Sequence, residues 1–232
     1  MTIKSTRKKL CLSLLDRTLH FFSFQLALDY GINESILLTD LARNIKNIKS
    51  HSRHPGWFFS TLEEFCDRHP YLTKDQIRYA LEILRDKKVL ITTGKYNRKS
   101  YDRTLWYAFS TSEIFKEALS KSEYAISFVV ADAMRIGVKP AILLRRARYN
   151  YMVNRLTDDD FNPTDLHDEW GSLMSPAFVR KAWAVIVNDS LSGITRKYSG
   201  FGKPYEYSID ETPYDYKYHD CTELYDDLEA YE

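Results

Sequence analysis

Leu72-Thr-Lys-Asp-Gln-Ile-Arg-Tyr-Ala-Leu-Glu-Ile-Leu84 is the stretch of sequence that decides the fold. It predicts a helix with a defined start, because the Thr73 hydroxyl can accept from the backbone N–H of Gln76 while the Gln76 side chain reaches back to the Thr73 N–H. Apolar residues then recur near the helical period, so one face of the helix is expected to be buried. That face is formed by Ile77, Ala80, Leu81 and Leu84.

A diverged copy of this stretch occurs 102 residues later, over residues 174–186. Further upstream, Gly31-Ile-Asn-Glu-Ser-Ile-Leu-Leu38 matches Gly137-Val-Lys-Pro-Ala-Ile-Leu-Leu144 with an offset of 106 residues. A third match pairs Lys95-Tyr96 with Lys197-Tyr198, and an aromatic strand follows each of these dipeptides. Three matches in the same order predict two copies of one module.

Each copy predicts a helix, a short strand, a helix, a turn, a helix and a hairpin, which is the order of a winged helix-turn-helix module. In the first copy Thr61 has Glu64 three residues on, which is the capping-box spacing and predicts another capped helix. Gly94 and Asn97 provide the turn of the hairpin. The elements expected in the first copy are a helix over residues 34–47, a strand over 56–60, a helix from Thr61 to near His69, a helix after Thr73 and hairpin strands over 89–93 and 105–109.

The second copy has the same expected order. Its predicted elements are helices over residues 140–156, 163–170 and 175–188 and a hairpin over residues 193–209 that turns at Gly200 and Gly202. The expected fold class is therefore mostly α with small β-hairpins (α+β), built as two tandem winged helix-turn-helix domains. The expected domains are residues 1–115, with an N-terminal helical extension, residues 122–209, and an acidic, tyrosine-rich tail over residues 210–232.

Several strings in the first copy carry a resemblance. They are Glu34-Ser-Ile-Leu-Leu38, the aromatic strand after Gly56-Trp57, and Asp102-Arg-Thr-Leu-Trp-Tyr107 at the end of the wing. On these strings residues 31–110 resemble the N-terminal winged-helix domain of phage replication proteins of the replisome-organiser or initiator group. The tandem arrangement also resembles plasmid replication initiators. The resemblance implies DNA binding in replication, although the C-terminal half lacks signs of the helicase-loader module that such phage proteins often carry.

The last helix before each hairpin is the expected reader of DNA. In a helix-turn-helix the second helix enters the major groove, while wings and flanking basic groups hold phosphates. In the first copy the exposed face carries Arg78 and Tyr79 among three acidic residues. In the second copy the equivalent face carries Arg180 and Lys181 and no acid, which favours this helix as the source of most base contacts. The rest of that face consists of Ala177, Ala184 and Asn188.

The two wings carry the remaining candidate DNA contacts. Basic hairpin turns are also common as plain solvated loops, so this alternative stays open. In the helix over residues 140–156, Arg145, Arg146 and Arg148 could contact phosphate or could simply lie on the surface. The wing candidates are Lys95, Tyr96, Asn97, Arg98, Lys99 and Arg103 in the first copy and Arg196, Lys197, Tyr198 and Lys203 in the second.

A formal net charge of +1 conceals two unlike parts of the chain. From Glu206 to Glu232 ten acidic residues stand against one lysine, so this segment carries about −9 and residues 1–205 carry about +10. A basic body is typical of a protein whose partner is a polyanion such as double-stranded DNA. The acidic tail could screen the DNA-binding surface or be recognised by another replication protein.

Composition argues against several other classes of protein. A hydrophobic content of 44% with 14% aromatic residues excludes a wholly disordered chain. No stretch approaches the ~20 apolar residues that a membrane helix needs. Three scattered cysteines argue against a disulfide framework, so a cytoplasmic location is expected.

Motifs for catalysis, cofactors and metals are weak or incomplete. Gly200-Phe-Gly202-Lys203 lacks the other residues of a phosphate-binding loop. His51-x-x-His54 and Cys66-x-x-His69 have a spacing compatible with zinc, but a loop histidine and a core cysteine explain them more simply. The sequence therefore predicts a protein that is not an enzyme and that has no metal site and no cofactor.

The sequence leaves two alternatives to replication initiation open, one that binds DNA and one that does not. A transcriptional regulator would use the same fold and the same contacts with DNA. A phage-encoded inhibitor would instead present the acidic tail to a host factor as a mimic of nucleic acid. Such a mimic would compete with DNA for its target and would have no affinity for DNA itself.

Overall fold

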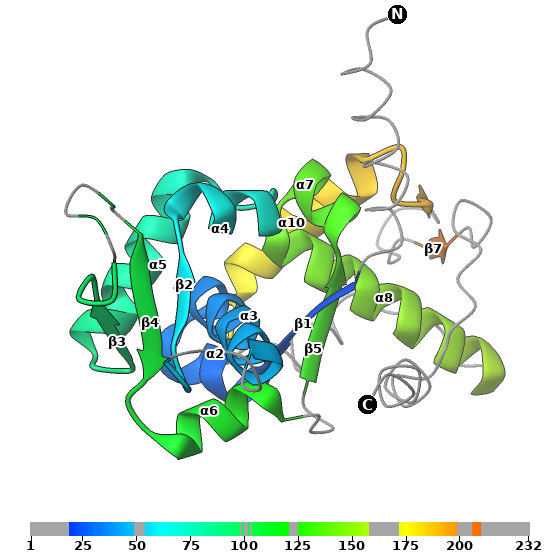
Figure 1. Ribbon diagram of the computed structural model, residues 1–232. Helices are drawn as coiled ribbons and strands as arrows, with labels where there is room; N and C mark the ends of the chain where they lie inside the picture. Colours follow the sequence, from blue (N-terminus) through cyan, green and yellow to red (C-terminus); the bar gives the residue numbers. More distant parts are fainter. Residues whose placement is uncertain are drawn as a thin grey trace, which may run out of the picture.

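The structure is a computed structural model that describes residues 19–48, 54–97, 99, 102, 104–120, 125–157, 172–198 and 206–209. Within these ranges the chain is α+β, with eight helices and three small antiparallel sheets (Figure 1). In the same ranges no helix combines the length and the apolar character needed to cross a membrane. Outside them lie the expected helix over residues 163–170, the expected tail over residues 210–232, and Arg98, Arg103 and Lys203.

The first copy has the expected order of elements. These are α3 (Ile32–Ile48), β2 (Phe58–Ser60), α4 (Leu62–Arg68), α5 (Lys74–Asp86), β3 (Leu90–Thr93) and β4 (Leu105–Phe109). The three strands form one antiparallel sheet in the order β2–β4–β3. An additional helix, α6 (Ser112–Leu119), follows the sheet and packs against α3.

The local signals for helix starts in the first copy are confirmed. Thr61 and Glu64 form a capping box at the start of α4, and Thr73 and Gln76 form one at the start of α5. Three of the four residues of the predicted apolar face of α5 are fully buried, and Leu81 is partly buried against the same core. These caps satisfy backbone N–H groups that the first turn of each helix leaves without an intrahelical partner.

The second copy is described over its first and last elements. They are α8 (Val138–Thr157), α10 (Pro176–Asn188), β6 (Ile194–Lys197) and β7 (Glu206–Ile209). β6 and β7 pair as an antiparallel hairpin, and α10 packs against both α8 and β6. The order of these elements agrees with the expectation for a second module, within the part of it that is described.

Both copies begin earlier than the sequence repeat indicated. β1 (Leu19–Ser23) and α2 (Phe24–Tyr30) precede α3, just as β5 (Ala125–Val129) and α7 (Val130–Ile136) precede α8. The N-terminal extension was expected to be helical, and α2 agrees with this, whereas residues 19–23 form a strand because they pair with β5 from the second copy. Residues 1–18 of the extension lie outside the described residues.

A glycine separates the short helix from the long helix in each copy. Gly31 has a φ of 118° and Gly137 a φ of 91°, a region of backbone space that favours glycine. Each glycine N–H donates to the carbonyl four residues earlier, from Gly31 to Ala27 and from Gly137 to Ala133, with both N···O distances at 3.0 Å. The chain therefore turns in the same way at the start of α3 and of α8.

The β1–β5 ribbon joins the two copies near the centre of the molecule (Figure 1). Phe22 of β1 and Phe128 of β5 are almost fully buried, and their ring centroids lie 6.3 Å apart. Tyr71, from the turn between α4 and α5, contacts the Phe128 ring edge-on at 5.1 Å. Because Phe128 belongs to the second copy and Tyr71 to the first, the copies share one continuous core.

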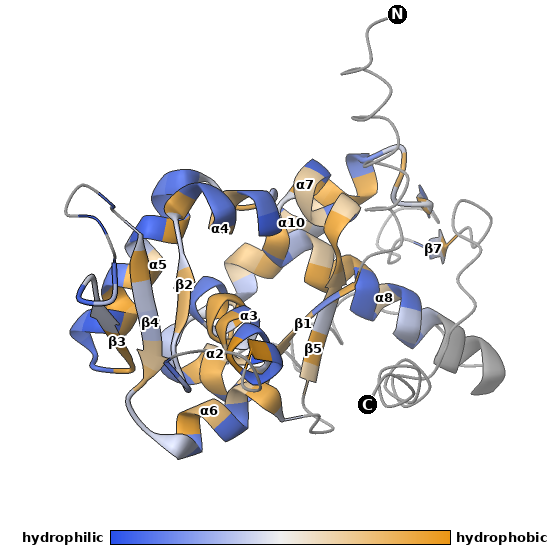
Figure 2. Ribbon diagram, in the orientation of Figure 1, coloured by the Kyte–Doolittle hydropathy of each residue, from blue (hydrophilic) through white to orange (hydrophobic). Residues whose placement is uncertain are grey.

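Apolar residues concentrate around this junction. Figure 2 shows hydrophobic colours along α3 and β5 and hydrophilic colours on α4. The largest fully buried side chains include Phe22, Phe65, Phe128, Leu37, Leu38, Leu41, Leu143 and Leu144. The exposed faces of α5 and α10 and the two hairpins thus surround one apolar core.

Candidate nucleic-acid interface

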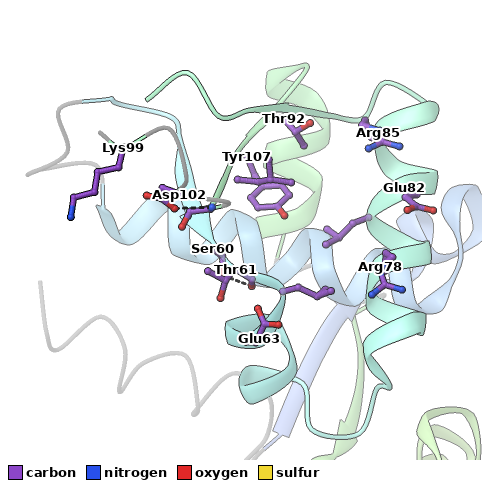
Figure 3. A pocket seen from close by; sticks show the side chains of 14 residues that line it. Ser60, Thr61, Glu63, Arg78, Glu82, Arg85, Thr92, Lys99, Asp102 and Tyr107 are labelled. Carbon is purple, nitrogen blue, oxygen red and sulfur yellow. Dashed lines mark hydrogen bonds between the residues drawn. The ribbon is translucent and has the colours of Figure 1, made fainter. Parts of the chain in front are cut away.

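An open groove of about 540 Å³ lies between α5, the start of α4 and the β3–β4 hairpin. Arg78, Glu82 and Arg85 of α5 stand on one side of the groove, while Lys99 and Asp102 stand on the other (Figure 3). The groove therefore brings α5 and the first wing, the two candidate DNA-contacting elements of the first copy, to one surface.

The cations of α5 are largely engaged by carboxylates. Arg78 lies 2.8 Å from Asp75, and Arg85 lies 3.4 Å from Asp86. Lys74 lies 2.7 Å from Glu63 on α4. Exposed pairs of this kind add little stability, but they lower the positive potential that a DNA backbone would meet. Tyr79 is 65% exposed, so its ring is accessible for stacking or packing by a partner.

Tyr96 of the first wing belongs to an aromatic cluster. Its ring stacks on that of His54 with centroids 3.9 Å apart, and it meets Trp57 and Trp106 edge-on at 5.4 Å each. Phe59, which is 49% exposed, continues the cluster with a centroid 4.9 Å from that of Trp106. Tyr96 therefore helps to fix the wing against the outer face of the sheet.

Asn97 holds the turn of the first wing through three hydrogen bonds. Its amide nitrogen donates to the carbonyls of Asp102 at 2.9 Å and Thr104 at 2.8 Å. Its amide oxygen accepts from the Trp106 indole N–H at 2.8 Å. Because its side chain makes these three hydrogen bonds, Asn97 stabilises the turn of the wing. The described residues of this wing that remain candidates for phosphate contact are Lys95 and Lys99, which are both exposed.

The exposed face of α10 differs from that of α5 in charge. Arg180 and Lys181 are exposed, and none of the exposed residues of α10 is acidic. The opposite face is buried, and it includes Trp183, which is 8% exposed and lies 5.6 Å from the Tyr207 ring. The expectation that Trp183 is a core residue is therefore confirmed. The other exposed positions of α10 are Pro176, Ala177, Ala184, Val185 and Asn188.

The second wing continues this basic surface. Arg196, Lys197 and Tyr198 are exposed, and β6 packs against α10. Lys197 lies 3.8 Å from Glu206 on β7, but both side chains are mostly in solvent, so the pair is weak. The described candidates of the second copy are thus exposed cations and one tyrosine on two elements that pack against each other.

Arg148 is the clearest departure from the sequence-based expectation. It is 9% exposed, donating to the Asp132 carboxylate at 3.2 Å and to the Ser192 carbonyl at 2.9 Å. Asp132 is fully buried and also pairs with Arg135, which in turn pairs with Asp189 after α10. Neither a phosphate contact nor a surface role fits Arg148, because the guanidinium ties α7 and α8 to the segment that follows α10.

Arg145 and Arg146 lie near each other on α8 but have different partners. Arg145 donates from Nε to the Ser127 hydroxyl of β5 at 2.6 Å. Arg146 lies over the Tyr149 ring, 5.0 Å from its centroid. Both are partly exposed, so both alternatives for these two residues remain open.

A cluster of titratable side chains at the junction was not identified from the sequence. The Tyr71 hydroxyl lies 2.6 Å from His20 Nδ1 and 2.9 Å from His69 Nδ1, and His69 Nε2 lies 3.4 Å from Asp40. Arg68 donates to Asp40 at 3.0 Å. Burial raises the pKa of Tyr71, and burial together with the charge of His69 lowers the pKa of His20 to about 4. Both ring nitrogens of His69, which the sequence had paired with Cys66 as a zinc spacing, thus face Tyr71 and Asp40.

No known family model matches the chain, and neither the curated proteins nor the solved structures contain a significant match to it.

Proposed function

We propose that the chain binds double-stranded DNA through two winged helix-turn-helix modules. Support comes from the order α3, β2, α4, α5, β3, β4 and from the strand order of its sheet, which are those of a winged helix. Three residues lie between the C-cap of α4, His69, and the N-cap of α5, Thr73, which is the length of turn found in a helix-turn-helix. The repeated start and the α10–β6–β7 end of the second copy support a second module of the same kind.

The observation that carries this proposal is the basic, acid-free face of α10 beside the basic strand β6. Arg180 and Lys181 project from the helix that directly precedes the β6–β7 hairpin, as α5 precedes the β3–β4 hairpin. A side chain such as arginine can donate two hydrogen bonds to guanine in the major groove, and each good pair of this kind contributes about 1–3 kcal/mol of discrimination between bases. Arg196 and Lys197 would hold the neighbouring phosphates.

We assign this DNA binding to replication initiation, of the phage or plasmid type. The support is the resemblance of residues 31–110 to phage replication proteins, while a transcriptional regulator of the same fold is the competing role. A preferred site within or beside the gene itself, near replication genes, agrees with initiation, whereas a site in a promoter between divergent genes contradicts it.

The test of DNA binding is a fluorescence-anisotropy titration of the full chain with duplex DNA over a series of salt concentrations. Each phosphate contact should add about 0.9 to the slope of log affinity against log salt. Replacing Arg180→Ala and Lys181→Ala together should weaken binding by about tenfold or more. Lys116→Ala is the matched control, because Lys116 is an exposed cation on α6 and should leave binding unchanged. Failure of the unmodified chain to bind any duplex would overturn the proposal.

A further inference from the structure

The pairing of β1 with β5 has a specific register. Phe21 lies opposite Ser127, and these two residues are separated by the same 106 positions that relate Gly31 to Gly137. The central residues of the two strands are therefore equivalent positions of the repeat, placed directly across from each other.

The pairs on either side of this central pair are equivalent to each other under the repeat. His20 lies opposite Phe128, and Phe22 lies opposite Ile126. Moving each residue by 106 positions turns one of these pairs into the other. Two antiparallel strands that meet in this way are related by a local twofold axis, which passes between Phe21 and Ser127.

The elements that follow the ribbon obey the same relation. α2 and α7 each have seven residues, each ends at a glycine with a positive φ, and each leads directly into a long helix. α5 packs on α3 in the first copy, and α10 packs on α8 in the second. In Figure 1 the first hairpin and the β6–β7 hairpin lie at opposite ends of the molecule, with the ribbon between them.

The joint between the copies is packed, so it holds their relative orientation. Phe22 and Phe128 are 1% and 0% exposed, and Tyr71 of the first copy rests against Phe128 of the second. Arg145 of α8 also donates to the Ser127 side chain at the centre of the ribbon. The described elements of one chain thus show the twofold relation that dimeric helix-turn-helix proteins obtain from two chains.

We propose, on the basis of the proposed DNA binding, that a single chain recognises an imperfect inverted repeat, with one half-site for α5 and one for α10. Two recognition helices related by a twofold axis contact the bases of one duplex in opposite orientations, so the half-sites are inverted. The two halves differ in strength because the cations of α5 are paired with acids, whereas the face of α10 is basic. Their centres lie a whole number of helical turns apart, at about 10 bp per turn.

The first experiment is selection of binding sites from a random duplex library by the full chain, followed by the mass of the complex from analytical ultracentrifugation. The expected result is an imperfect inverted repeat bound by one chain. Rebuilding the selected site as a direct repeat, with the same half-sites and spacing, should weaken binding at least tenfold. Selection of a direct repeat or an undivided site, or binding of two chains to one duplex, would overturn this inference but leave DNA binding intact. If no duplex is bound at all, the proposed function itself fails.

Two pairs of variants assign the half-sites. Arg180→Ala with Lys181→Ala should flatten base preference in the stronger half only, and Arg78→Ala with Tyr79→Ala should flatten it in the weaker half only. All four side chains are exposed, so the fold should be kept, which circular dichroism checks. A variant pair that flattens both halves equally contradicts the assignment.

Discussion

Protonation of His20 is expected to destabilise the folded chain. Burial and the neighbouring His69 lower its pKa to about 4, against 6.5 for an exposed histidine. The unfolded chain therefore binds this proton more readily than the folded chain. We expect the free energy of unfolding to be at its full value above pH 6.5 and to decrease by up to about 3 kcal/mol as the pH falls to about 4. Urea unfolding at several pH values in this range measures the change.

His20→Gln is the matched variant, since glutamine can still hydrogen-bond Tyr71 but does not titrate. It should remove the loss of stability between pH 6.5 and 4. Although burial raises the pKa of Asp40, contacts with His69 and Arg68 outweigh it and the net pKa is lowered. The Asp40 contribution is therefore lost only at lower pH and should remain. Glu34, whose pKa burial raises, acts with the opposite sign and is also unchanged by the variant. An unaltered pH dependence in His20→Gln would exclude His20 as its source.

Arg148 is expected to be a strong determinant of stability. Arg148→Met leaves the buried Asp132 with Arg135 as its remaining guanidinium partner and leaves the Ser192 carbonyl without its donor. Loss of one partner from a buried charge pair typically costs about 3–5 kcal/mol. Arg146→Met on the same helix is the control, because Arg146 is partly exposed, and it should cost less than about 1 kcal/mol. Equal losses in urea denaturation would show that the Arg148 pairs do not stabilise the fold.

For the candidate DNA-contacting residues on helices, the sequence was sufficient to predict which side chains are exposed. Arg78, Tyr79, Arg180 and Lys181 are all exposed, because the apolar stripe on the same helix already defines the opposite side. The roles of Asn97 and Arg148 were not predictable in this way. The partners of Arg148 lie 16 residues before it and 44 residues after it, so the folded chain has to bring them together.

At the scale of elements, local signals were sufficient for the helices that carry them. Capping boxes located the starts of α4 and α5, and the end expected for α4 near His69 agrees with the structure. β1 and β5 escaped prediction because each is a five-residue strand whose partner is in the other copy. The central pair, Phe21 and Ser127, is 106 residues apart, and no local sequence pattern in either strand indicates a partner at that distance.

The two glycines between short and long helices are expected to be unequal. Ala at either position must adopt a positive φ, which should cost about 1 kcal/mol or more. At Gly31 the new Cβ would also lie 2.2 Å from the Glu34 carboxylate, whereas at Gly137 the nearest atom, in Pro140, is 3.8 Å away. Gly31→Ala should therefore destabilise the chain more than Gly137→Ala.

Thermal denaturation of both glycine variants measures this difference. Gly94→Ala serves as a control, because Gly94 does not have a positive φ and its nearest contact is 3.8 Å away. An effect of Gly137→Ala that equals or exceeds that of Gly31→Ala would show that Glu34 moves aside without cost.

At the scale of the whole molecule, the shared core predicts that the two copies unfold together. Phe128 is fully buried and contacts His20, Phe22 and Tyr71, all of which belong to the first copy. Neither copy can lose its fold without exposing apolar surface of the other. We expect one calorimetric transition whose measured and van't Hoff enthalpies agree.

Phe128→Ala tests whether the ribbon couples the copies. Removal of this ring should cost about 3–5 kcal/mol. Because the cavity lies between the copies, hydrogen exchange should become faster in α5 and in α10 alike, although Phe128 belongs to neither helix. Phe59→Ala, at a half-exposed position on β2, should cost less and should leave α10 unaffected. Faster exchange confined to the second copy in Phe128→Ala would show that the modules are stable independently. The fixed orientation on which recognition of an inverted repeat depends would then have to come from DNA itself.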